Sequence, residues 1–265
     1  MTNDEPNPQE PIWRGVLMGT APEFRSARSF FQHVPGGPRC KMCAAPFGGP
    51  FAPFVRMRGR RPWAKNPKYC GRCFNLLAQV HGGAEVPCTL LFADVRGSTA
   101  LAETVDATEF RRLMQRFYES ASRVLVAHDA IVDKFVGDEV MAIFIPALSQ
   151  ERHAARAIDA AIGLIRANEE AAGDAPPLPI GAGVHTGQAY VGSIGEGLNT
   201  EMSALGDVVN TAARLASAAG PGEVLVSLDA GEAAGLAMGE LEHRSLELKG
   251  KSAVTEVAVI KPLAR

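Results

Sequence analysis

Two stretches decide the fold of this chain: LLFADVRGST at Leu90–Thr99 and KFVGDEVMAIF at Lys134–Phe144. Each places an aspartate beside a tight turn at the end of an apolar, strand-like run, Asp94 in the first and Asp138 in the second. A carboxylate at the end of a buried strand lies at the rim of a sheet, where it can hold a hard cation beside phosphate oxygens. The two stretches therefore predict a metal-dependent phosphate site at a sheet rim.

Strands and helices alternate on both sides of these stretches. A helix is expected to begin at Asp106, where Glu109 completes a capping-box pattern, and Gly137-Asp138 is expected to form a hairpin turn. The run from Ile180 to Gly195 predicts a second hairpin that turns at Gly187. Further strands are expected at 223–227, 241–248 and 254–260. This order predicts an α+β, ferredoxin-like fold, an antiparallel sheet flanked by helices.

A third segment, SALGDVVNTAARL at Ser203–Leu215, predicts a helix that begins after Gly206. Asn210 and Arg214 are four residues apart and therefore share one face of this helix. The rest of the helix is largely apolar, so an ordinary solvent-facing polar pair is a poor explanation for these two residues.

Together the three segments resemble the class III nucleotide cyclase family, enzymes that convert ATP or GTP into a cyclic 3′,5′-monophosphate. The resemblance runs from Glu85 to the C-terminus. It implies two Mg²⁺ or Mn²⁺ ions per active site and a homodimer with a pair of equivalent sites at its interface. The residues it implicates are Asp94, Asp138 and the carbonyl of Val95 for the metals, the amides of Ser98 and Thr99 and the side chain of Lys249 for the phosphates, Asn210 for the ribose, and Arg214 for charge at the α-phosphorus.

Base choice is expected to come from Lys134 and Ser203. A lysine donor beside a hydroxyl acceptor suits adenine, whereas guanine presents the reverse pattern. In the family, guanylate cyclases carry Glu at the position of Lys134, and one branch of bacterial adenylate cyclases has Thr or Ser at that of Ser203. These residues favour an adenylate cyclase acting on ATP. A guanylate cyclase and a catalytically silent nucleotide-binding regulatory domain are the alternatives.

The N-terminal third differs in composition. Residues 1–23 are polar and proline-rich and predict a disordered tail, whereas residues 24–84 carry 11 basic side chains and no acidic one. Residues 85–265 hold 15 basic and 25 acidic side chains, so two modules are expected. A short helix is predicted at 74–80 and a linker at 81–84.

Two C-x-x-C pairs in the basic segment predict one structural Zn²⁺ in a zinc-ribbon-like module, with an iron–sulfur cluster or a redox dithiol as alternatives. The ligands would be Cys40, Cys43, Cys70 and Cys73. The basic charge is expected to face the acidic module. A nucleic acid is the less favoured partner because base-stacking aromatics are few, although Trp63 and Tyr69 keep it open.

No apolar stretch reaches the roughly 18–20 residues that cross a bilayer, and the acidic, proline-rich start is unlike a signal peptide. The sequence therefore predicts a cytoplasmic protein without a membrane span, in which cysteines are metal ligands or buried thiols rather than disulfides.

Overall fold

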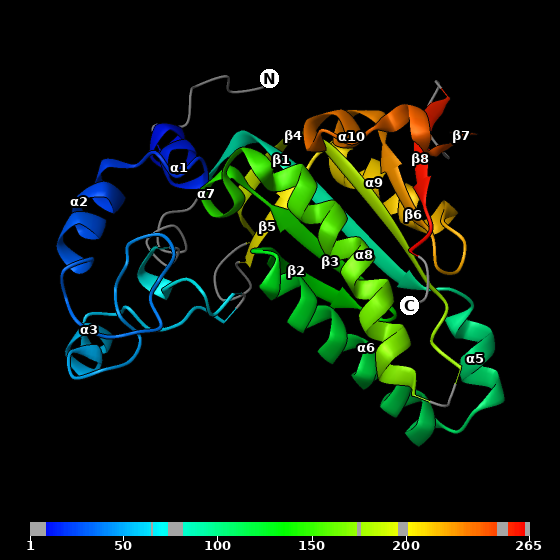
Figure 1. Ribbon diagram of the computed structural model, residues 1–265, viewed down its shortest axis with the longest axis horizontal. Coiled ribbons are helices and arrows are strands. Elements are labelled where there is room, and N and C mark those ends of the chain that lie inside the picture. Colours follow the sequence, from blue (N-terminus) through cyan, green and yellow to red (C-terminus); the bar gives the residue numbers. More distant parts are fainter. Residues whose placement is uncertain are drawn as a thin grey trace.

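The computed structural model describes residues 9–64, 66–73, 82–173, 176–195, 201–247 and 254–262. One large sheet with helices on both faces occupies most of the molecule, and the N-terminal residues lie to one side of it (Figure 1). Among the described helices, none has the length and apolar character that a bilayer crossing requires.

The sheet has the strand order β2-β3-β1-β4-β6-β8-β7, and β5 pairs with β4 away from this path. β4 and β6 pair in parallel, whereas the sequence predicted an antiparallel sheet. The reason is that the connection between them contains a helix, which is long enough to return the chain in the same direction. The strands are β1 (Gly83–Val95), β2 (Ile131–Val136), β3 (Glu139–Phe144), β4 (Ile180–Ile194), β5 (Glu201–Leu205), β6 (Val224–Ser227), β7 (Glu242–Leu246) and β8 (Thr255–Ile260).

The helices bury their apolar faces on the two sides of this sheet. Side chains at alternate positions of β1 point to opposite faces, so Leu91 packs with α6 and α8 while Leu90 packs with α1 and α9. Asp106 caps α6 as expected, because its side chain accepts hydrogen bonds from the amides of Thr108 and Glu109. The helical elements are α1 (Glu10–Leu17), α2 (Pro22–Phe31), α3 (Ala52–Met57), α5 (Ser98–Thr104), α6 (Ala107–Ala127), α7 (Pro146–Ser149), η1 (Gln150–Arg152), α8 (His153–Ala172), α9 (Asp207–Ala218), α10 (Leu228–Ala234) and η3 (Met238–Glu240).

β4 is one continuous strand of 15 residues, so the predicted hairpin turn at Gly187 is wrong. Gly187 pairs with Cys88 in the middle of the strand. The glycines serve the contact with α9 instead: a Cβ on Gly183 would lie 2.3 Å from the backbone nitrogen of Ala216. Absent side chains therefore let α9 lie directly on the sheet.

The predicted disordered tail is also wrong for residues 9–23, since these form α1 and the start of α2. Trp13, Val16 and Leu17 are buried in the same apolar cluster as Leu90 of β1. Gly83 and Ala84 belong to β1 and so are not a linker. The predicted helix at 74–80 lies outside the described residues.

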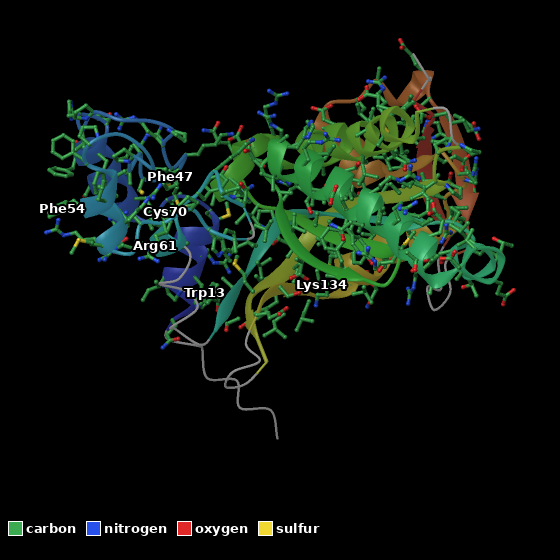
Figure 2. All side chains as sticks on the ribbon, turned by 90° about the horizontal axis from the view of Figure 1, so that it is seen from below. Trp13, Phe47, Phe54, Arg61, Cys70 and Lys134 are labelled. Atoms are coloured by element: carbon green, nitrogen blue, oxygen red, sulfur yellow. The ribbon has the colours of Figure 1, made fainter. Side chains whose placement is uncertain are left out.

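Residues 9–64 and 66–73, called here the N-terminal module, are fastened to the turn that precedes β2. Asp129, whose side chain is 4% exposed, accepts hydrogen bonds from Lys41 Nζ at 2.6 Å and Lys68 Nζ at 3.1 Å. Asn66 Nδ2 donates to the carbonyl of Ala130 at 2.8 Å. Figure 2 shows the module, with Phe54 and Cys70, to one side of the sheet that carries Lys134.

The edge strand β7 carries a charged network. Arg244 donates to Glu223 at 3.0 and 3.1 Å and to Glu242 at 2.9 Å, and Lys261 donates to Glu242 at 3.0 Å. The outer edge of the described sheet is therefore lined with paired charges.

Candidate functional site

The two predicted metal ligands lie side by side at the ends of neighbouring strands. Asp94 is the last residue of β1 that pairs with β3, and it lies opposite Glu139. Asp138 occupies the β2–β3 turn, and its carbonyl accepts a hydrogen bond from the amide of Val95 at 3.1 Å. The antiparallel pairing of β1 with β3 thus brings these carboxylates to one corner of the sheet.

This corner concentrates negative charge. Asp94 Oδ1 is buried without a hydrogen-bond partner among the described residues, while its other oxygen pairs with Arg96. Burial raises the pKa of Asp94, with Arg96 opposing and Asp138 adding to the rise. Burial and the charges of Asp94 and Asp138 also raise the pKa of Glu139 to about 6. An orphaned carboxylate oxygen among acidic neighbours fits a divalent cation with oxygen ligands.

The turn after β1 closes the corner on its other side. Gly97 has φ +69° and leads into α5, whose first residues are Ser98 and Thr99. The Ser98 hydroxyl donates to Asp138. The first amides of a helix have no carbonyl partner within the helix, so the amides of Ser98 and Thr99 are available to an acceptor.

The predicted base-selecting residues meet at a third residue, Asp133. Ser203 Oγ donates to Asp133 Oδ2 at 2.6 Å, and Lys134 Nζ lies 3.5 Å from the same oxygen. Ser203 and Asp133 are 5% and 6% exposed, whereas 44% of the Lys134 side chain is exposed. A side-chain hydrogen bond therefore links β5 to β2, and a lysine and a hydroxyl converge on one buried carboxylate.

Asn210 and Arg214 lie on the outward face of α9. The opposite face is buried: Val208 and Ala212 pack in the apolar cluster of β1 and β4, and Leu215 packs in that of β6 and β8. Asn210 is exposed and Arg214 is half-buried, and neither has an ion pair or side-chain hydrogen bond to another described residue. Lys249, predicted to bind the terminal phosphates, lies outside the described residues.

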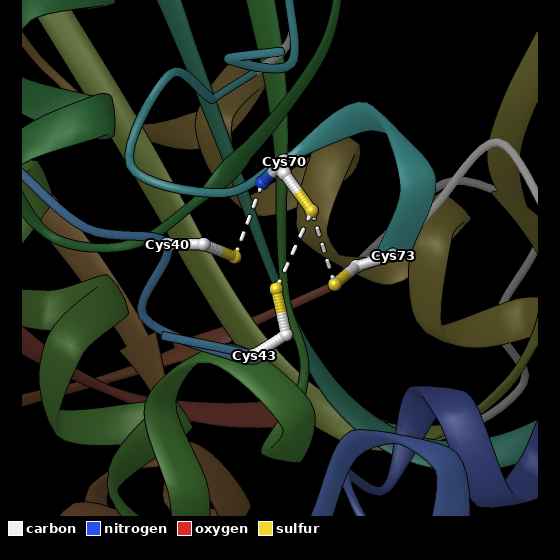
Figure 3. A group of neighbouring side chains, drawn as sticks. All are labelled: Cys40, Cys43, Cys70 and Cys73. Atoms are coloured by element: carbon white, nitrogen blue, oxygen red, sulfur yellow. Dashed lines mark hydrogen bonds between the residues drawn. The ribbon is translucent and has the colours of Figure 1, made fainter. Parts of the chain in front are cut away.

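The four cysteines of the N-terminal module form one buried cluster (Figure 3). Their sulfur atoms all lie within 4.8 Å of one another, with Cys43 to Cys70 at 3.6 Å and Cys70 to Cys73 at 3.3 Å. All are free thiols. Four sulfurs bound to one zinc at about 2.3 Å are separated by just under 4 Å, so the cluster fits a tetrahedral ion.

The surroundings favour the thiolate form at Cys43, whereas hydrogen bonds with Cys40 and Cys43 raise the pKa of Cys70 and of Cys73. Hydrogen bonds, first with Cys40 and then with Cys70 and Cys73, lower the pKa of Cys43. Arg60 Nη1 also donates to Cys43 Sγ at 3.1 Å, and the amide of Cys70 donates to Cys40 Sγ at 3.2 Å. A thiolate is the form that binds metal, so a cation would complete this buried charge balance.

Three residues were not predicted from the sequence: Arg96 and Glu139 at the corner of Asp94 and Asp138, and Asp133 beside Lys134 and Ser203. Each is next to or near a predicted residue, since Asp133 precedes Lys134 and Glu139 follows Asp138. Adjacency alone would have been misleading, because neighbouring residues on a regular strand point to opposite faces.

Comparison with known proteins identifies the family of this chain. Residues 83–260 match the adenylate and guanylate cyclase catalytic domain, and the chain belongs to that family. Adenylate cyclase 1 of Rhizobium meliloti is 31% identical over 132 residues, which are 48% of this chain and 20% of that protein. The chain spans between a fifth and about a third of the length of the first curated relatives it matches.

Solved structures show the same fold. The guanylyl cyclase Cya2 superimposes with a TM-score of 0.62 at 28% identity, covering 67% of this chain and 93% of that one. The adenylyl cyclase CyaB from P. aeruginosa gives a TM-score of 0.59 at 28% identity, covering 67% and 95%. Relatives of both specificities thus share the fold, so the choice of base must be argued from the site itself.

Proposed function

We propose that this protein is an adenylate cyclase that converts ATP to 3′,5′-cyclic AMP and pyrophosphate. The observation that carries the proposal is the convergence of Lys134 and Ser203 on one buried carboxylate. Adenine presents an acceptor at N1 and a donor at its 6-amino group, whereas guanine presents a donor and then an acceptor. A lysine that donates beside a hydroxyl that accepts matches adenine.

In the proposed reaction the ribose 3′-oxygen attacks the α-phosphorus in line, and the bond from that phosphorus to pyrophosphate breaks. Asp94, Asp138 and the carbonyl of Val95 would hold two Mg²⁺ or Mn²⁺ ions, which when bound would lower the pKa of the 3′-hydroxyl and neutralise the triphosphate. Asn210 orients the ribose. Arg214 stabilises the negative charge that builds at the α-phosphorus.

The remaining phosphate contacts are assigned to the amides of Ser98 and Thr99 and to the side chain of Lys249. The hydrogen bond from Ser98 to Asp138 supports this assignment, because it sets the start of α5 beside the proposed metal site. Because the substrate is ATP, the proposed place of action is the cytoplasm.

The active form is proposed to be a homodimer with two equivalent sites at its interface. The outward position of Asn210 and Arg214 on α9 supports it, since these side chains face away from their own sheet. Each site would then take its metal ligands from one subunit and its base-selecting and transition-state residues from the other.

The cysteine cluster is assigned one structural zinc ion, and the N-terminal module is proposed to regulate the cyclase. Its basic charge is directed inward at one point, where Lys41 and Lys68 hold Asp129. Asp129 lies just before β2, the strand that carries Lys134. A change in the module therefore has a short route to the base site.

The test is to incubate the purified protein with ATP or GTP and either magnesium or manganese, and to identify the product by chromatography against cyclic AMP and cyclic GMP. Cyclic AMP from ATP is the expected product. Cyclic GMP as the main product would reassign the base choice. No cyclic product, with nucleotide binding intact, would favour the silent regulatory domain.

A further inference from the structure

Asp133 lies between the two groups that read the base, and the reaction proposed above gives it no role. We infer that Asp133 determines specificity by fixing the direction of the Ser203 hydroxyl, so that Ser203 presents only an acceptor to the base. This inference rests on the proposed function of the site. It makes Asp133 a positioning residue that acts through Ser203.

The local backbone explains how Asp133 reaches this place. The pairing of β2 with β3 shifts register between Val132 and Lys134, which leaves Asp133 as the extra residue of a β-bulge. A bulge re-aims side chains that would otherwise alternate between faces. Asp133 and Lys134 are consecutive in sequence, yet their charged groups lie 3.5 Å apart.

The hydroxyl of Ser203 has one proton and two lone pairs, so by itself it can donate or accept. Its proton is directed at Asp133 Oδ2 across 2.6 Å, a short bond to a carboxylate. What remains for another partner is a lone pair. Ser203 can therefore accept from the 6-amino group of adenine, but has no proton for the 6-oxygen of guanine.

The position of Lys134 fits the same edge of the base. Ser203 Oγ and Lys134 Nζ contact the same oxygen, which places them within about 6 Å of each other, close enough to bond neighbouring atoms of one ring. The lysine donor suits adenine N1 and opposes the N1 proton of guanine. Asp133 therefore accounts for one of two contributions to base choice, and Lys134 keeps the other.

The decisive measurement is the ratio of kcat/KM for ATP to that for GTP. Asp133→Val has a similar volume, suits a strand and accepts no hydrogen bond, so it frees the Ser203 proton. We expect the ratio to fall about tenfold, mostly through KM, which corresponds to about 1.4 kcal/mol. Glu223→Gln, which alters a carboxylate in the charged network at β7, is the matched control and should leave the ratio unchanged.

A second variant separates positioning from general damage. In a Ser203→Ala background, Asp133→Val should change the ratio less than twofold, because the hydroxyl it orients is absent. An unchanged ratio in Asp133→Val, or an equal fall in both backgrounds, would show that Asp133 does not act through Ser203.

Two readouts keep the inference separate from folding and from turnover. Wild-type protein should discriminate at least several-fold against purine riboside triphosphate, which lacks the 6-amino group; equal use of this analogue and ATP would overturn the inference even if Asp133 variants fail to fold. The α,β-methylene analogues of ATP and GTP cannot cyclise, and the ratio of their Kd values should fall in the same way. Absence of any cyclic product would contradict the proposed function, whereas these binding ratios still decide the role of Asp133.

Discussion

An equal mixture of two inactive variants, Asp94→Ala and Arg214→Ala, should recover about one quarter of wild-type activity if each site is shared by two subunits. In a mixed dimer, one site combines both altered residues and is inactive. The other combines the intact Arg214 of the first variant with the intact Asp94 of the second. Random exchange makes half of the dimers mixed, and each mixed dimer has one of its two sites intact.

The positions of the two residues determine what each variant loses and what it keeps. Asp94→Ala removes a carboxylate whose buried Oδ1 has no partner within the described chain, and with it the oxygen proposed to bind the metal ions. Losing such a ligand should cost orders of magnitude in turnover. Arg214 lies on the outward face of α9, so its loss should leave the core and the melting temperature nearly unchanged.

The assay is cyclic AMP formation after subunit exchange, with mixed dimers verified by co-purification of differently tagged copies. Asp94→Ala mixed with Asp138→Ala is the control, because both changes fall on the same half-site and every combination stays inactive. No recovery in the first mixture, despite demonstrated mixed dimers, would refute shared sites. Equal recovery in the control mixture would refute the assignment of the half-sites.

Three further predictions concern the metal cluster and stability. Metal analysis should find about one zinc per chain, and Cys40→Ser combined with Cys43→Ser should abolish it and lower the melting temperature; iron in its place would contradict the assignment. Asp129→Asn should lower the free energy of unfolding by about 1–3 kcal/mol in chemical denaturation. The loss is modest because the side chains of Lys41 and Lys68 are 46% and 31% exposed and remain hydrated without their partner. No change would mean that the contact of Asp129 with the N-terminal module adds nothing to stability. Hydrogen bonds from Arg244 hold the pKa of Glu223 at about 2, below its usual 4.5, so the stability it contributes is present above pH 4.5 and is lost as the pH falls toward 2. Thermal melts of Glu223→Gln should therefore differ from wild type near neutral pH and converge near pH 2, and a constant difference would contradict this origin.

The strands and the proposed corner carboxylates could be predicted because their signals are local. The apolar runs before Asp94 and after Asp138 indicate buried strands whatever their neighbours are, and the cap at Asp106 depends only on the next few residues. Ser203 and Lys134 could be named from the resemblance. Their meeting at Asp133 could not, because it depends on a register shift between two strands.

The predictions of a disordered N-terminus and of a turn at Gly187 are wrong because tertiary contacts override the local pattern there. α1 has 8 residues, too short to be stable alone, and exists because it buries Trp13 beside β1. Gly187 suggested a turn, yet it stands mid-strand under α9. A sequence pattern records that a small residue is needed there, without saying whether the chain must bend or another element must approach.

The paired charges along β7 have a consequence for how copies of this protein meet. An exposed strand edge offers unpaired amides and carbonyls to any other strand, and extension of the sheet from chain to chain is the usual hazard. At β7 an incoming strand would have to displace the water around Glu242, Arg244 and Lys261, and at the opposite edge the bulge at Asp133 interrupts the straight ladder that a new strand needs. The β2 and β7 edges of the described sheet thus both disfavour extension from one chain to the next, which opposes growth into a filament.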